Sequence, residues 1–221
     1  MRLITSASAL LLGLHHVRVW KLTSDQPLLR ADDGLSAEAA AGAWEQDAPE
    51  LPGGYRKLLA DLGYEGTTPA GERLREGVRT RGWRSHGAVV DAVSVATLRH
   101  GAGIGLHSLF KEDEGSDLVV TRAAGTERIV PAFSTKSRPV PAGDLLYGLA
   151  DPDGAVEEPF AWLGRRDCDA AARQLAPDSR EAILVVLGCP GEDAAHSETI
   201  GTTVATLLTE LRPDVTLTPV A

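Results

Sequence analysis

The sequence is poor in aromatic residues and in cysteine. Only 5% of its 221 residues are aromatic, so the core has to be built mainly from Val, Leu, Ile and Ala. The two cysteines, Cys168 and Cys189, are too few and too far apart for a disulfide framework or a metal cluster. We therefore expect packed or partly exposed thiols and a reducing, cytoplasmic location.

Motifs that identify several enzyme classes are also missing. There is no GxxxxGK[ST], HExxH, CxxC or GxSxG, which argues against a P-loop, a zinc site and a nucleophile elbow. No apolar run approaches the roughly 20 residues of a membrane span, so we expect no membrane contact. The net charge of -9 argues against an extended nucleic-acid surface, although it leaves room for a small basic site.

Helical patterns dominate the first half of the sequence. Ser36 is a residue type favoured at N-caps, and it precedes an expected helix over residues 37–46. Apolar residues between positions 55 and 62 recur as on one face of a helix, and Gly63 ends the pattern. A further helix is expected after Pro69.

Residues 88–98, AVVDAVSVATL, are compatible with two structures. Their β-branched content favours a strand, whereas the spacing of Val89, Val93 and Ala96 suits one face of a helix. The sequence alone leaves both open.

Strand patterns dominate the second half, after a first strand expected at residues 14–22. Short apolar runs bounded by Gly, Pro or Asp predict strands at 117–123, 127–133, 144–150, 182–188 and 215–220. Gly125-Thr126 is expected to join the first two of these runs as a hairpin. Ser197 is the expected cap of a last helix, which ends before Pro213. Helices followed by strands predict an α+β fold, and no clean boundary divides residues 1–221, so we expect a single domain.

The stretch 69–110 concentrates positive charge. Its arginines include Arg75, Arg79 and Arg84, which could hold terminal phosphates of a ligand by bidentate hydrogen bonds. A solvated helix face, interleaved with glutamates, is the alternative.

A glycine-rich turn, Gly101–Gly105, follows in the same stretch. Glycines let the backbone approach a ligand closely, and His107 just beyond them could bond a substrate or orient a water. Asp91, inside an apolar run, is either a helix cap or a carboxylate held for function. Trp162 and Arg165 could place an indole beside a guanidinium as a stacking platform, or belong to an ordinary surface loop.

In order and spacing, five short segments resemble the editing domain of the bacterial phenylalanyl-tRNA synthetase β subunit, and more closely its free-standing relatives. The segments are Val90–Ser94, Ile104–Ser108, Gly125–Glu127, Pro141–Tyr147 and Trp162–Arg165. The resemblance covers roughly residues 50–210. It implies an α+β fold whose pocket admits the aminoacylated 3′ end of a tRNA, with no metal or organic cofactor.

The resemblance also implies which residues contact the substrate. They are Asp91, Ser94, Gly105, His107, Glu127, Trp162 and Arg165. Ser94 stands where the family has Asn, and Gly105 stands where the synthetase has His. These departures leave two hypotheses open. One is hydrolysis of mischarged aminoacyl-tRNA in trans. The other is a non-catalytic module that binds RNA ends or a small aminoacyl-like metabolite, in which Asp91 and Glu127 are structural.

Overall fold

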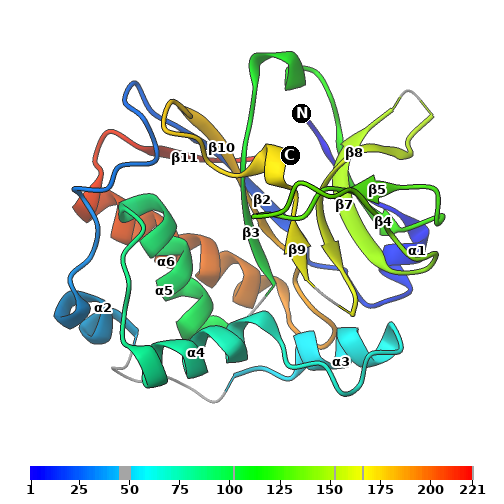
Figure 1. Cartoon of the computed structure of the whole chain (residues 1–221), viewed down its shortest axis with the longest axis horizontal. Helices are drawn as coiled ribbons and strands as arrows, with labels where there is room; N and C mark the ends of the chain where they lie inside the picture. Colours follow the sequence, from blue (N-terminus) through cyan, green and yellow to red (C-terminus); the bar gives the residue numbers. More distant parts are fainter. Residues whose placement is uncertain (45–50, 102, 152, 166, 221) are drawn as a thin grey trace.

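A computed structural model of the chain describes residues 1–44, 51–101, 103–151, 153–165 and 167–220. Its elements in chain order are β1 (Leu3–Thr5), α1 (Ala7–Leu10), β2 (Arg18–Thr23), α2 (Ala37–Trp44), α3 (Gly54–Asp61), α4 (Ala70–Arg81), α5 (Ala88–His100), β3 (Ile104–Ser108), η1 (Lys111–Asp113), β4 (Leu118–Arg122), β5 (Arg128–Ile129), β6 (Arg138–Pro139), β7 (Leu145–Ala150), β8 (Val156–Leu163), β9 (Cys168–Asp169), η2 (Ala171–Arg173), β10 (Glu181–Val186), α6 (Ala194–Leu211) and β11 (Thr216–Pro219). This is an α+β fold with one mixed and one antiparallel larger sheet, as the sequence predicted (Figure 1).

The antiparallel sheet has the strand order β11-β2-β10-β3. Successive residues of its central strand β10 face opposite sides. Leu184 and Val186 pack against α5 and α6, while Ile183 and Val185 pack toward the other large sheet. Burial on both faces explains why this strand is an unbroken apolar run rather than an alternating one.

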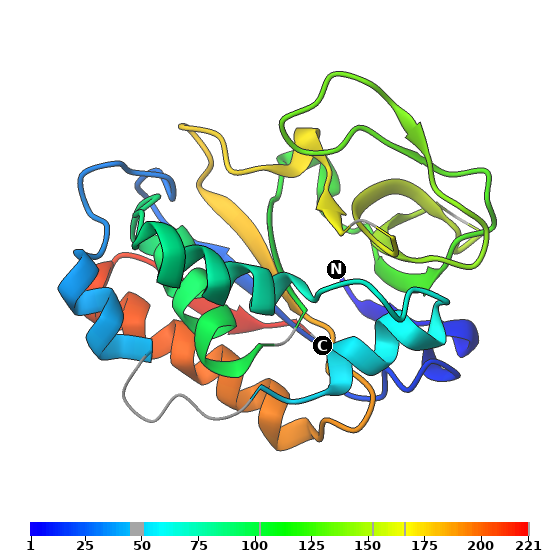
Figure 2. The ribbon, with the colours of Figure 1, turned by 60° about the horizontal axis from the view of Figure 1, so that its bottom comes forward.

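The mixed sheet has the order β1-β4-β7-β8-β9, in which only the β1–β4 pair is parallel. On β7, Leu145, Tyr147 and Leu149 belong to the same apolar core as Ile183 and Val185 of β10. The two large sheets therefore share one core. In Figure 2, β9 lies on one side of β3 and β10, and α4 and α5 lie on the other.

Residues 88–98, which the sequence left ambiguous, belong to α5. The helix is buried against α6, the antiparallel sheet and α2, so its apolar residues are distributed nearly all round it. A helix in such a position shows little amphipathic periodicity. The helices predicted at 37–46 and 55–62 correspond to α2 and α3, although residues 45 and 46 lie outside the described residues.

Two predictions about local structure are wrong. The strands on either side of Gly125-Thr126 do not form a hairpin, because β4 pairs with β1 and β7 while β5 pairs with β6. The last helix does not begin at Ser197. Asp193 caps it instead, accepting a 2.8 Å hydrogen bond from the His196 amide, and Ser197 is buried within the first turns. Among the described residues, no helix is long and apolar enough to cross a membrane.

Candidate ligand-binding cleft

Two adjoining cavities open between the mixed sheet and the β3 end of the antiparallel sheet. The carboxylate cavity, of about 350 Å³, contains Asp167 and Asp169. The Ser94 cavity, of about 530 Å³, lies on the α5 side. Both are bordered by Ile104, Phe133 and Asp169, so the two cavities adjoin at these residues, and together they are called the cleft. Each volume falls within the range of known small-molecule sites.

The carboxylate cavity takes its walls from several elements. Aromatic side chains come from α3, β7 and β8, namely Tyr55, Tyr147 and Trp162. Strand β9 and the residue before it supply Asp167 and Asp169. These two carboxylates are two positions apart in extended chain, so they point to the same side.

Asp167 is an ionisable group with little solvation. Neither of its carboxylate oxygens accepts a hydrogen bond of ordinary geometry from the described residues, and both are buried. Asp167 forms an ion pair with Arg73 of α4, with an N–O distance of 3.5 Å. Burial raises the pKa of Asp167, and the neighbouring Tyr55 hydroxyl and Arg73 partly oppose that shift.

Asp169 lies at the junction of the two cavities. Its side chain is exposed to solvent where the two cavities meet, although nearby protein atoms still displace part of its water. This partial desolvation, together with the charge of Asp167, raises the pKa of Asp169 to about 6. Asp169 therefore changes charge close to neutral pH. The cysteine between them, Cys168, stays a thiol, because burial raises its pKa to about 11.

His107 does not lie on a flexible glycine loop, contrary to the prediction. It is on strand β3 and fully buried behind Tyr147, and its Nε2 is 2.7 Å from the Tyr147 hydroxyl. Burial lowers the pKa of His107 to about 3, so the ring is neutral at physiological pH. His107 supports a wall of the cavity through Tyr147 and is not itself among the cavity-lining residues.

The absence of a side chain at Gly105 leaves room for the hydrogen bond between His107 and Tyr147. A Cβ atom there would lie 2.0 Å from the Tyr147 hydroxyl and 2.5 Å from His107 Nε2. Gly105 does not line either cavity. The glycine that does border the carboxylate cavity is Gly103.

Ser94 on α5 lines the cavity named after it, together with His86. Asp91, one turn earlier, does not. Its carboxylate is buried and accepts hydrogen bonds from the Leu35 amide, the Ser85 hydroxyl and the His86 amide. Asp91 therefore ties the start of α5 to Leu35 and Ser85, and it also holds the backbone of His86 beside the cavity.

Trp162 lines the carboxylate cavity with its indole held in place, because Nε1 donates a 2.7 Å hydrogen bond to Asp144. Arg165 is exposed and borders neither cavity. Within the described chain, both guanidinium–ring contacts belong to Arg173, over Phe110 and Phe160. No stack of Arg165 on Trp162 is formed in this structure.

Glu127 closes the turn after β4 and lies outside the cleft. Its carboxylate accepts hydrogen bonds from the Ala124 and Gly125 amides at 2.9 and 2.8 Å, which lowers its pKa against the opposing effect of burial. It is a turn-stabilising residue in this structure.

The three predicted phosphate-binding arginines occupy different positions. Arg75 is turned inward, and its guanidinium donates to the Leu98 carbonyl at 2.6 Å at the end of α5. Arg79 and Arg84 are exposed and make no ion pair with described residues. Arg84 is two residues from His86, which borders the Ser94 cavity.

The predicted site residues did not include several cleft residues, among them Asp167, Asp169, Tyr147 and Phe133. An Asp-Cys-Asp triplet is a weak signal, since alternate acidic residues also occur on exposed strands. Where the structure describes the chain, no three His, Cys, Asp or Glu side chains gather as a metal site.

The structure is that of an α+β protein with a cleft of small-ligand size between two sheets. No family model matches the chain, and no curated protein matches its sequence. Among solved structures it is similar to an N-terminal fragment of the phenylalanyl-tRNA synthetase beta-subunit from Pyrococcus horikoshii, with a TM-score of 0.48 and 11% identity. The match covers 95% of this chain and 48% of that fragment, so the chain spans about half its length. This is a distant likeness in structure.

Proposed function

We propose that the cleft binds an aminoacyl ester, and that its natural ligand is the aminoacylated 3′ end of a tRNA. The observation that carries the proposal is the distribution of chemistry along the cleft. Carboxylates and aromatic rings line one cavity, and a larger cavity continues from it past Asp169. An aminoacyl ester has matching parts, since it joins a protonated amine and a side chain to a nucleoside.

In this arrangement the amino acid occupies the carboxylate cavity. Its ammonium group would lie near Asp167, whose buried carboxylate accepts no hydrogen bond of ordinary geometry from the described residues and has Arg73 as an ion-pair partner at 3.5 Å. The side chain would contact Tyr55 and Trp162. The nucleoside would extend into or over the Ser94 cavity, where Ser94 and His86 offer hydrogen-bonding groups.

The basic residues outside the cleft fit contact with a few phosphates. Arg79 and Arg84 are free to bind, in a chain whose net charge of -9 disfavours a broad nucleic-acid surface. The tRNA would therefore be held by its end, with few phosphate contacts and a weak salt dependence.

Hydrolysis in the same cleft would use Asp169 as the base. Its carboxylate takes a proton from a water, and the water oxygen attacks the ester carbonyl. The bond from the carbonyl carbon to the ribose oxygen then breaks. The products are the free amino acid and a tRNA whose 3′ hydroxyl has taken up a proton. A carboxyl that titrates near neutrality is suited to this task.

A panel of mischarged tRNAs tests the activity. We expect at least one aminoacyl-tRNA to lose its amino acid faster with the protein than in buffer. Loss at the buffer rate for every member would reject hydrolysis.

The second candidate is binding without turnover. It is favoured by Ser94 and Gly105, which stand at the positions of the synthetase's Asn and His. It is also favoured by the engagement of Asp91 and Glu127 in the protein's own hydrogen bonds. It predicts that aminoacyl esters raise the melting temperature while remaining intact. Absence of both turnover and a melting shift would reject the aminoacyl-ester site itself.

A further inference from the structure

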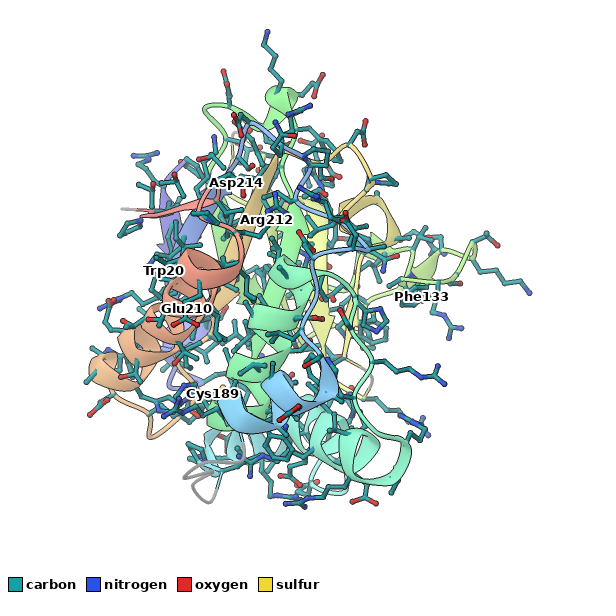
Figure 3. All side chains as sticks on the ribbon, turned by 90° about the vertical axis from the view of Figure 1, so that its left-hand side faces the viewer. Trp20, Phe133, Cys189, Glu210, Arg212 and Asp214 are labelled. Atoms are coloured by element: carbon teal, nitrogen blue, oxygen red, sulfur yellow. The ribbon has the colours of Figure 1, made fainter. Side chains whose placement is uncertain are left out.

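Phe133 is unusual in both its exposure and its backbone. Its side chain is 96% exposed, although it borders both cavities of the cleft. Its φ of 59° makes it the one non-glycine residue with positive φ in the described chain. Figure 3 shows it on an outlying loop, away from Trp20 and α6.

The loop that carries Phe133 is anchored directly beside the carboxylates. The Ala132 amide donates a 2.7 Å hydrogen bond to the Asp169 carbonyl, and the Ala171 amide donates to Val130. The Ser134 amide donates to the Pro131 carbonyl at 3.0 Å and closes a four-residue turn with Phe133 in its third position. The backbone of the turn is thereby held beside Asp169, at the point where the two cavities meet.

Neither the exposed ring of Phe133 nor its positive φ stabilises the protein in the absence of a ligand. The third position of a turn with positive φ favours glycine, and a bulky side chain there is strained. An exposed phenyl ring also gains nothing from burial. Such outliers are concentrated at ligand sites, where a bound molecule supplies the missing contact.

We infer that Phe133 stacks on the terminal adenine of the ligand, an inference that rests on the proposed function. If the ammonium group lies near Asp167, the ester lies near Asp169 and the nucleoside leaves the carboxylate cavity past Phe133. The base is the one planar group of the 3′-terminal residue, and aromatic side chains bind bases by stacking. Phe133 is then a positioning residue for the nucleoside, and it takes no part in bond breaking.

Two variants at this position separate the role of the ring from effects on folding. Phe133→Gly removes the ring and suits the left-handed backbone, so its melting temperature should equal or exceed that of the natural protein. Phe133→Trp keeps an aromatic face. The ligands are 3′-aminoacylamino-3′-deoxyadenosines carrying alanine, leucine or phenylalanine, which cannot be hydrolysed as esters, and the matching amino-acid amides, which lack a base.

We expect Phe133→Gly to raise the Kd of the adenosine ligands by about 5-fold to about 150-fold, which is the range for the loss of one stacked base. Binding of the amino-acid amides should not change, and Phe133→Trp should restore the adenosine ligands. Unchanged adenosine binding in Phe133→Gly would overturn the stacking while leaving the proposed function standing. An equal loss of affinity for the amides and the adenosine ligands would also overturn the stacking. If the natural protein binds none of the adenosine ligands, the proposed function fails and the stacking fails with it.

Discussion

At the scale of single residues, Asp169 combines two properties that occur together at reactive sites. It borders both cavities, and its carboxyl titrates near neutral pH because of its partly desolvated position and the charge of Asp167. A carboxyl with an ordinary pKa would be a weaker proton acceptor by about two pK units. Its role in hydrolysis can be tested separately from binding.

Asp169→Asn should lower kcat/KM for the aminoacyl-tRNA that is hydrolysed by about 100-fold or more, because the amide cannot accept the proton of the water. In the natural protein, kcat/KM should fall about tenfold for each pH unit below pH 6, as the carboxyl becomes protonated. The matched control is Asp25→Asn, at an exposed position outside the cleft. A flat profile between pH 5 and pH 7 would remove Asp169 from the reaction.

Gly105 provides a second residue-scale prediction. Gly105→Ala places a methyl group against the Tyr147 hydroxyl and His107, so it should lower the free energy of unfolding by about 1–3 kcal/mol, as overpacking does. Gly42→Ala is the control, because nothing lies within 4 Å of a Cβ at that position and Gly42 is inside α2. It should stabilise the protein by about 1 kcal/mol. Chemical denaturation measures both, and a neutral Gly105→Ala would show that the pair can move aside.

Residue positions could be predicted only in part from the sequence. Ser94 and Trp162, which belong to the segments of the family resemblance, line the cleft. His107 does not, because its burial depends on Phe160 and Tyr147, which are distant in sequence. Exposure of Phe133 could not be predicted either, since it depends on a turn anchored to β9.

At the scale of elements, α4 combines structural and exposed arginines. Arg75 packs onto the end of α5, whereas Arg79 is exposed on the helix and Arg84 is exposed in the segment that follows it, neither with an ion-pair partner among the described residues. Helical spacing shows that such residues are on the surface. It does not show which guanidinium finds a carbonyl on the neighbouring helix.

The two classes of arginine should respond differently to substitution. Replacing both Arg79 and Arg84 by Ala should weaken tRNA binding and reduce the slope of log affinity against log salt by about 0.7–0.9 for each phosphate that is no longer neutralised. Arg75→Ala should lower the melting temperature and leave that slope unchanged, because its guanidinium is bound to α5. Binding titrations at several salt concentrations measure the slopes. Identical slopes in the natural protein and both variants would mean that these arginines do not contact phosphate.

Elements could be predicted where the signal is local in sequence, and could not where it depends on pairing between distant segments. Helix α3 has one buried face, so its apolar spacing is a clear signal, and β10 is a short apolar run bounded by turns. The prediction of a hairpin after β4 was wrong, because turn residues show that the chain bends but do not show which strands pair. Pairing of β4 with β1 joins residues more than 100 positions apart.

At the scale of the whole molecule, the two large sheets share a core that contains a buried histidine. His107 lies between them, and His100 is buried between α5 and α6, where its Nε2 is 2.9 Å from the Thr203 hydroxyl. Burial lowers the pKa of His107 to about 3 and that of His100 to about 4. Both remain neutral in the folded chain at pH values where an unfolded chain protonates them.

This difference fixes the direction of the pH dependence of stability. Below pH 6.5 the unfolded chain binds protons at both histidines and the folded chain does not, so the free energy of unfolding should fall as the pH is lowered from 6.5 toward 4. Each histidine contributes at most about 1.4 kcal/mol per pH unit. Asp169 acts in the opposite direction, because its raised pKa lets the folded chain take up a proton first between pH 6 and pH 4. The raised pKa values of Asp167 and Glu192 act in the same direction as Asp169, so the fall in stability should be smaller than the two histidines alone would give.

Denaturation at a series of pH values tests this account. His100→Gln should make the fall in stability between pH 6.5 and pH 4.5 shallower, because one of the two uncompensated protonation sites is gone. His15→Gln should leave it unchanged, since His15 is exposed and solvated in the folded chain as well as in the unfolded one. The position of the buried histidines follows from the packing of two sheets and two helices that are far apart in the chain. An unaltered slope in His100→Gln would mean that the buried ring reaches solvent, and that the α5–α6 contact opens more readily than its packing indicates.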